Sequence, residues 1–268
     1  MTVKVKIIDA HAHIFPEKIS AKATHAISDF YAHIDMAHNG SAEELLKSGE
    51  KAGVSRYLVF STATTAAQVE SINDFILSQA ELHKEFIPVG TMHADFKNYE
   101  EEIERIYNRG IRGIKLHPDF QKFNFDDERM LPIYEFLEKK GMFVVTHSGD
   151  YRYGFSHPLR VANIAKKFKK LDIIAAHCGG WSQWDTAIEC LILPNIYVDS
   201  SSTMGFFDKN IVKKSLECYG RDRMFFGTDF PMWDHVGELK RLEELGLDDD
   251  TMEAVLYRNF ENFYERKK

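Results

Sequence analysis

Histidine side chains suited to binding a metal ion stand close together near the start of this chain. The stretch reads Asp9-Ala10-His11-Ala12-His13 and ends an alternating apolar run. In a β-strand, residues two apart point to the same face, so Asp9, His11 and His13 are predicted to share one face. The pair alone is equally compatible with two histidines that only pack at the edge of a core.

Further candidate ligands end later apolar runs of the sequence. They are Lys115, His117, His147, His177, Asp199 and Asp229. Imidazole and carboxylate groups that converge from separate strands are typical of catalytic sites for Zn²⁺, Mn²⁺ or Fe²⁺, with positions left open for water and substrate. A structural zinc site would instead fill all four positions from tightly spaced ligands.

The elements that must position these residues alternate along the chain. Apolar β-rich runs predict eight strands, at 4–9, 55–61, 86–92, 111–117, 142–147, 172–177, 195–200 and 223–229. Helical periodicity predicts helices at 41–53, 65–84, 99–109, 128–140, 158–170, 183–192, 208–219, 236–246 and 249–264. Gly53, Gly110 and Gly141 follow three of these helices and predict left-handed helix ends.

Eight strand–helix units predict a (β/α)8 TIM barrel, because parallel strands joined by right-handed crossovers close at that number. The 268 residues suit one such barrel, and without a linker or repeat we expect residues 1–268 to form a single domain. An open doubly wound sheet would need a glycine-rich phosphate loop, which the sequence lacks.

Residues 14–53 exceed one crossover helix, so part of this insertion between the first two strands is predicted to cover the barrel mouth. Catalytic residues in this fold lie at the C-terminal strand ends, where the candidates fall.

Composition narrows the class of protein. A formal net charge of −7 argues against a nucleic-acid partner. Three widely spaced cysteines, Cys178, Cys190 and Cys218, form neither a disulfide framework nor a cysteine zinc site and favour a reducing compartment. The sequence begins without a signal-peptide pattern and has no apolar run of about 18 residues. We therefore expect a cytoplasmic protein with no membrane partner, and a homo-oligomer is compatible with the sequence.

Five motifs in barrel order carry a resemblance to a known family. They are D-A-H-A-H at 9–13, G-I-K-L-H-P at 113–118, V-T-H-S-G at 145–149, A-H-C-G-G at 176–180 and F-G-T-D-F-P at 226–231. The chain resembles the amidohydrolase superfamily over residues 7 to 264, above all the branch called amidohydrolase family 2, which includes hydrolases and metal-dependent decarboxylases.

The resemblance implies roles for individual residues. His11, His13 and His147 would bind a divalent metal through imidazole nitrogens. Asp229 would bind the metal or its water and transfer the proton, whereas His177 would bind a second metal or position the attacking water. Zinc is the expected ion, with manganese or iron as alternatives, and one or two ions per chain.

Other residues have two open interpretations. Lys115 would either be carboxylated and bridge two ions, as in two-metal relatives, or pair its ammonium with a carboxylate or an anionic substrate. His117 would be a ligand or a substrate contact. Asp9 would either orient a ligand imidazole or bind backbone groups beneath the site. Arg152, His157, Trp181 and Trp233 follow the strand ends and are candidate contacts for an aromatic or carboxylated substrate.

The leading functional hypothesis is metal-dependent hydrolysis of an amide, ester or lactone bond in a small molecule, catalysed by Asp229 and His177. The alternative is non-oxidative decarboxylation of an aromatic or unsaturated acid at the same metal. A TatD-like nuclease would need a glutamate where this chain has Lys115. A non-catalytic metal-binding barrel would not need the proton-transferring Asp229.

Overall fold

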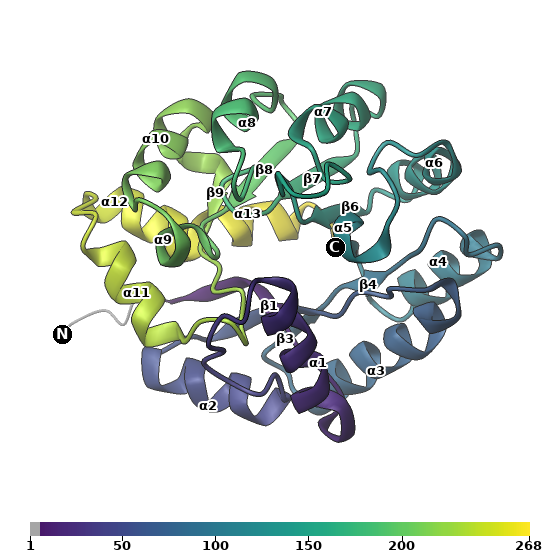
Figure 1. Cartoon of the computed structure of the whole chain (residues 1–268), viewed down its shortest axis with the longest axis horizontal. Helices are drawn as coiled ribbons and strands as arrows, with labels where there is room; N and C mark the ends of the chain where they lie inside the picture. The colour runs from purple at the N-terminus through teal and green to yellow at the C-terminus, as the bar shows by residue number, and fades with distance from the viewer. Residues whose placement is uncertain (1–5) are drawn as a thin grey trace.

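The strands of the computed structural model, which describes residues 6–268, form the centre of the molecule and the helices surround them (Figure 1). The strands are β1 (Ile8–His13), β2 (Arg56–Phe60), β3 (Phe86–Pro88), β4 (Gly90–Thr91), β5 (Gly113–Leu116), β6 (Phe143–Thr146), β7 (Asp172–Ala175), β8 (Ile196–Asp199) and β9 (Met224–Phe225). Each predicted strand is present, and the predicted third strand is divided into β3 and β4 at Val89. The first strand begins later than predicted and includes both histidines, while residues 4 and 5 of that prediction lie outside the described residues.

The helices follow the predicted alternation closely. They are α1 (Glu17–Phe30), α2 (Ala42–Ala52), α3 (Val69–Leu82), α4 (Tyr99–Asn108), α5 (Pro118–Gln121), α6 (Leu131–Lys139), α7 (Pro158–Lys167), α8 (Trp184–Cys190), α9 (Thr203–Phe206), α10 (Asn210–Tyr219), α11 (His235–Glu243), α12 (Asp249–Glu253) and α13 (Asn259–Glu265). A π-helical turn, Ala254–Arg258, joins α12 to α13. Gly53, Gly110 and Gly141 have φ angles of +77°, +99° and +68°, which confirms the left-handed helix ends.

All paired strands are parallel, in the order β1-β2-β3 and β4-β5-β6-β7-β8-β9. The chain beyond β9 returns to β1: Ala10 N donates to Phe226 O at 2.8 Å and His13 N donates to Phe230 O at 2.7 Å. These bonds bring the last strand segment against the first, as the predicted barrel requires.

Apolar side chains form two cores on opposite sides of the strands. Alternate strand residues such as Leu58, Val145 and Phe225 pack inside the barrel with Phe260 and Phe263 of α13. The intervening residues pack outward against the surrounding helices. Burial on both faces explains why the strands read as near-continuous apolar runs in the sequence.

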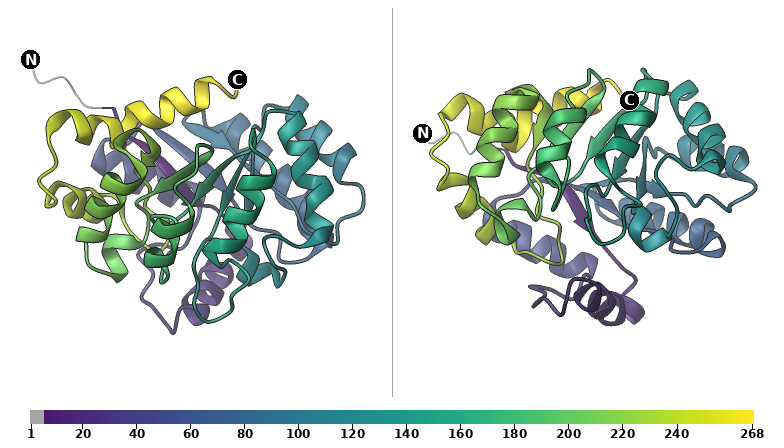
Figure 2. Two further views of the ribbon diagram at one scale, coloured as in Figure 1. Left: turned by 90° about the horizontal axis from the view of Figure 1, so that it is seen from above. Right: turned by 45° about the horizontal axis from the view of Figure 1, so that its top comes forward.

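Helices α13 and α1 lie at opposite ends of the barrel (Figure 2). α13 closes the end at which the strands begin, because Phe260 and Phe263 pack on the interior core there. α1 belongs to the insertion between β1 and β2 and lies at the end where the strands finish, as predicted for a segment that covers the mouth. Across residues 6–268, we find no helix with the length and apolarity needed to cross a bilayer.

Candidate metal centre

A β-bulge in β1 directs His11 and His13 into the barrel. The pairing register with β2 shifts between Asp9 and Ala12, so the alternation of faces slips by one residue there. His11 and His13 both contact the interior ring of Phe60, with centroids 5.0 Å and 4.8 Å away. Gly227 permits the close approach of the neighbouring strand, because a Cβ there would lie 2.9 Å from that of His11.

Asp9 does not share the face of the two histidines, and that prediction is wrong because of the bulge. Its carboxylate accepts bonds from the backbone N–H groups of His11 (2.9 Å) and Thr228 (3.1 Å) and from the Thr228 hydroxyl (2.6 Å). His235 Nε2 lies 3.0 Å from Asp9 Oδ2, the oxygen that also accepts from the Thr228 hydroxyl. Asp9 thus binds backbone beneath the site, which was the second of its two interpretations.

Asp199 fixes the orientation of His11. Its Oδ2 lies 2.9 Å from His11 Nδ1, and both side chains are fully buried. Burial opposes ionisation of this carboxyl, but His11 and His177 outweigh it and lower the pKa of Asp199 to about 2. A carboxylate can only accept, so Nδ1 of His11 carries the proton and its Nε2 presents a lone pair to the pocket.

Asp229 lies between His11 and His13. Its Oδ1 is 3.3 Å from His11 Nε2 and 3.4 Å from His13 Nε2, while the Ser202 hydroxyl donates to Oδ2 at 2.6 Å. Burial opposes ionisation, yet His11, His13 and His177 hold the pKa of Asp229 well below its usual value. Burial lowers the pKa of His13 to about 4, so this imidazole is neutral at pH 7.

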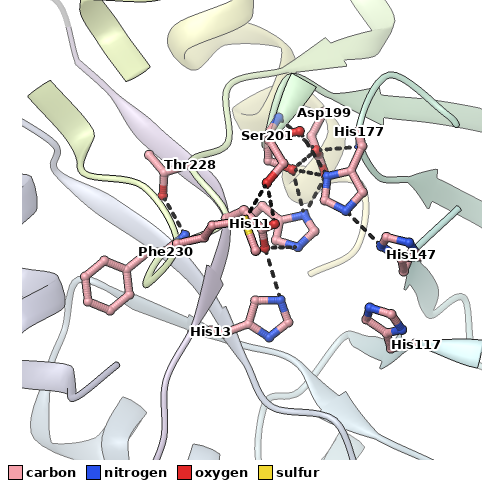
Figure 3. Close-up of polar contacts among 12 residues, drawn as sticks. His11, His13, His117, His147, His177, Asp199, Ser201, Thr228 and Phe230 are labelled. Atoms are coloured by element: carbon pink, nitrogen blue, oxygen red, sulfur yellow. Dashed lines mark hydrogen bonds and ion pairs between the residues drawn. The ribbon is translucent and has the colours of Figure 1, made fainter. Parts of the chain in front are cut away.

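His177 and His147 form a bonded pair beside this group (Figure 3). Nδ1 of His177 donates to the Ser201 carbonyl at 2.9 Å, because a carbonyl only accepts. Its Nε2 therefore accepts from His147 Nδ1, at 3.0 Å. Burial lowers the pKa of His177 to about 4 and that of His147 well below its usual value.

The other nitrogen of His147 faces a second carboxylate. Nε2 lies 3.9 Å from Asp119 Oδ2, and both atoms are buried without a hydrogen-bond partner among residues 6–268. Burial, with Asp150 nearby, raises the pKa of Asp119 to about 6. Asp150 also approaches this pair, but Arg152 already occupies both of its oxygens, at 3.0 Å and 2.7 Å.

Lys115 is the buried cation of the site. Its Nζ lies 3.1 Å from His11 Nε2 and 4.6 Å from the centre of the Phe60 ring. Burial lowers the pKa of Lys115 to about 8, against the opposing effect of Asp229 and Asp199. The ammonium donates to His11, and both interpretations of Lys115, as a carboxylated bridge or as a cation that pairs with an anionic group, stay predictions.

His117 is engaged with the insertion. Phe120 N donates to its Nδ1 at 3.4 Å, so Nε2 carries the proton and donates to the Tyr31 hydroxyl oxygen at 3.3 Å. The ring stacks on His147, with centroids 4.1 Å apart and planes within 7°. Both of its nitrogens are thus bonded within the chain, and its role as a metal ligand or a substrate contact stays a prediction.

His11, His13 and Asp229 fit a divalent cation. Their nearest ligand atoms all lie within 4.8 Å of one another. Nε2 of His11 lies 3.3 Å from a carboxylate oxygen of Asp229 and 3.1 Å from Lys115 Nζ, so a divalent cation between the two acceptors would replace the ammonium as the partner of His11. His147 lines the same pocket, but its nearest carboxylate partner is Asp119 rather than Asp229. The structure therefore groups three of the four predicted ligands and places the fourth beside them.

None of the four predicted substrate contacts is among the residues that line the pocket. Arg152 pairs with Asp150 and donates to Phe30 O at 2.6 Å, and His157 accepts from Leu159 N at the start of α7. Trp181 packs on Tyr31, with centroids 5.3 Å apart, and Trp233 donates to Ser202 at 3.0 Å. Their roles toward substrate stay predictions.

Sequence reasoning missed several participants. Tyr31, Phe30 and Asp119 touch or line the site. Tyr31 and Phe30 belong to the insertion, where no motif in the sequence marks them as site residues.

Comparison with known proteins places these observations in a family. The model of the amidohydrolase family matches residues 8–266. No curated protein matches the sequence.

Solved structures share the fold at low sequence identity. An uncharacterised TIM-barrel protein from Bordetella bronchiseptica is 20% identical, with a TM-score of 0.81 over 98% of this chain and 99% of that one. 5-Carboxyvanillate decarboxylase from Sphingomonas paucimobilis is 15% identical, with a TM-score of 0.71 over 97% and 99%. A dihydroxybenzoic acid decarboxylase from Polaromonas, solved with manganese, is 13% identical, with a TM-score of 0.75 over 98% of both chains.

The match over nearly the whole chain, the barrel and the grouped histidines and aspartate lead to one conclusion. This chain is a TIM-barrel member of the metal-dependent amidohydrolase family.

Proposed function

We propose that this protein is a metal-dependent hydrolase that cleaves an amide, ester or lactone bond of a small organic substrate. The observation that supports this proposal is the position of Asp229. Its ionised carboxylate lies at the pocket floor, 3.3 Å and 3.4 Å from two imidazole nitrogens, with Ser202 holding its other oxygen. A base placed there can take a proton from water and return it to a leaving group.

His11, His13 and Asp229 would hold the ion, with His147, which lines the same pocket, as the proposed fourth ligand. A divalent cation, for which we propose zinc, supplies a Lewis acid and lowers the pKa of a bound water toward neutrality.

The chain's own residues supply orientation and proton transfer. Asp199 keeps the proton on Nδ1 of His11, and Asp229 Oδ1 accepts the proton of the attacking water. His177 is held by Ser201 at Nδ1 and accepts from His147 at Nε2, so it would position that water only after Nε2 exchanges His147 for the water. Tyr31 stays protonated, because burial raises its pKa well above the usual value, and its O–H can donate to a substrate oxygen.

Decarboxylation of an aromatic or unsaturated acid is the second candidate. The buried ammonium of Lys115 beside the proposed metal ligands favours a substrate carboxylate. The structural neighbours include proteins of both kinds. Two are named as decarboxylases, of dihydroxybenzoic acid and of 5-carboxyvanillate, and a Pseudomonas putida protein is proposed to hydrolyse 2-pyrone-4,6-dicarboxylic acid.

A paired assay separates the two candidates. Protein reconstituted with zinc or manganese would be tested for hydrolysis of an ester, lactone and amide panel and for release of CO₂ from hydroxybenzoates. We expect turnover on the first panel that requires metal and is lost in Asp229→Asn. Metal-dependent CO₂ release without hydrolysis would replace the first candidate by the second.

A further inference from the structure

The pocket extends well beyond the proposed metal centre. Its volume is about 550 Å³, which is enough for a drug-sized molecule. Only its inner end is formed by the histidines, Lys115 and Asp229. The rest is bounded by α1 of the insertion and by the first half of α3.

One face of α1 forms the roof of this outer part. Its lining residues, spaced as one helical face, are Ile19, Ala23, Ala26, Ile27 and Phe30. Ile19 is 50% exposed and Ala26 is also exposed, so this apolar face is not packed against the barrel. Figure 2 shows α1 set apart from the body of the barrel.

The helix is nevertheless fixed at its C-terminal end. Arg152 donates to Phe30 O at 2.6 Å, and His117 donates to the Tyr31 hydroxyl at 3.3 Å. Thr24 donates to Asn39 O at 2.8 Å within the insertion. These bonds hold the apolar face of α1 over a space that protein side chains do not fill.

The opposite wall is apolar as well and ends at solvent. Ile72 and Phe75 of α3 line it, and the exposed residues Gln68 and Ser71 mark its outer rim. The space is therefore a groove that runs from the strand ends, between α1 and α3, to the surface.

The fixed charges of this groove are concentrated at its inner end. Lys115 and Asp229 are its lining residues with an ammonium or a carboxylate. Lys115 is fully buried, and among residues 6–268 the hydrogen-bond partner of Nζ is His11. An ammonium has three donors, so two of them are available to an anionic group.

We propose that the groove between α1 and α3 binds the elongated apolar part of a carboxylated substrate, whose carboxylate lies at Lys115. The occupant is a small amphipathic acid because the cation lies at one end and apolar walls lead away from it to solvent. This proposal rests on the proposed function for the reaction at the centre, but it concerns binding alone.

The small side chain of Ala23 sets the depth of the groove in this proposal. Ala23 lies in the middle of the lining face of α1, so Ala23→Trp would fill the groove beyond the metal centre. Ala21→Trp is the matched control, since Ala21 is exposed on the same helix and outside the groove.

The test measures dissociation constants of n-alkanoates from butanoate to decanoate by calorimetry, with metal-loaded and metal-stripped protein. For the wild type and Ala21→Trp we expect binding to tighten about two- to fourfold per added methylene group. Ala23→Trp should bind decanoate at least about tenfold more weakly than the wild type and leave butanoate unchanged. Decanoate should also bind more tightly than decanamide, because the amide lacks the charge recognised by Lys115.

Several results would overturn the proposal. They are affinities that do not depend on chain length, equal effects of the two tryptophan variants, or equal binding of decanoate and decanamide. A dimer in sedimentation that Ala23→Trp dissociates would assign the α1 face to a second copy of the chain instead. Chain-length selection that survives metal removal would stand even if no hydrolysis were found, so the two proposals fail separately.

Discussion

At the scale of single residues, burial and neighbouring groups set the protonation states of the histidines and of Asp229 at neutral pH. Burial lowers the pKa values of His13, His117, His147 and His177, so these imidazoles are neutral at pH 7. Asp229 remains ionised, because its pKa is held well below its usual value, above all by the neighbouring His11 and although burial opposes this. Neutral imidazoles and an ionised carboxylate are the forms in which these groups bind metals.

Replacing both His11 and His13 by alanine should abolish metal retention. Two of the three grouped ligands would be lost, and one carboxylate does not hold a transition metal ion at micromolar protein. Metal content after gel filtration checks this, with His33→Ala, an exposed histidine, as the control. Stoichiometric metal in the double variant would show that the ion binds elsewhere.

Asp229→Asn should reduce turnover at least about a hundredfold, because loss of a general base typically costs 10²–10⁴-fold. The amide keeps the shape and an oxygen near His11, so we expect most of the metal to remain. Turnover and metal content would be measured together, with exposed Asp222→Asn as the control. Near-normal turnover with full metal would leave Asp229 a structural role.

At the scale of elements, two irregular features build the site. The bulge in β1 turns His11 inward while Asp9 binds backbone on the other side. The insertion helix α1 supplies the roof, and its attachment depends on the β6–α7 loop. Arg152 there lies within 4.7–5.3 Å of four ring centres, two of which, Phe30 and Tyr31, belong to the insertion.

Arg152→Met should release the C-terminal end of α1 and destabilise the fold by about 3 kcal/mol, because it leaves the buried Asp150 carboxylate unpaired. Hydrogen exchange in residues 17–31 should accelerate more than elsewhere. The free energy of unfolding and the exchange rates check this.

The double variant Asp150→Asn/Arg152→Met separates the two effects. It should recover most of the stability, because no charge is left buried, while exchange in α1 stays fast. Slow exchange in α1 of either variant would show that Arg152 does not hold the helix.

At the scale of the whole molecule, the aromatic packing that closes the barrel and the candidate site lie at opposite ends of the strands. Aromatic residues of α13 close one end, and the strand ends at the other carry the polar groups of the site. A titratable carboxyl group is also buried on one of the surrounding helices. Glu238 of α11 is fully buried, bonded to Arg241, with Oε2 lacking a partner in the described chain.

Glu238 should make stability fall as the pH rises. Burial raises its pKa to about 7, against Arg241 and with Asp229 and Asp234 adding to the shift, whereas the unfolded value is 4.5. The folded state therefore binds more protons between pH 4.5 and 7, and the free energy of unfolding falls across that window by up to about 3 kcal/mol. Glu238→Gln should remove this slope.

Urea unfolding of both proteins from pH 4.5 to 8 checks this prediction. The difference in unfolding free energy between variant and wild type should shift in favour of the variant as the pH rises. An exposed carboxyl variant, Glu243→Gln, should show no such shift. A constant difference for Glu238→Gln would mean that this carboxyl is ionised throughout.

The sequence by itself determined the order of elements and the fold. Alternation of apolar runs and helical periodicity depends on local spacing, so eight strands and the helices between them were predictable. The C-terminal strand ends of a barrel meet at one end, which made the convergence of His11, His13 and Asp229 predictable as well. The division of the third strand at Val89 and the start of the first strand were not, because they depend on pairing with neighbours.

Only the tertiary structure decided which of these groups touch. The bulge in β1 moved Asp9 to the other face, although strict alternation predicted it beside His11. An arginine after a strand end is a plausible substrate contact. Arg152 instead pairs with the buried carboxylate of Asp150 and donates to Phe30 O at the end of α1, so it does not line the pocket. Tyr31 and the apolar face of α1 belong to the insertion. Its residues do not lie at the ends of predicted strands, so the strand pattern did not predict that they reach the site. Spacing along the chain specifies elements, but contacts between side chains depend on register, bulges and insertions, which are set by packing between residues far apart in sequence.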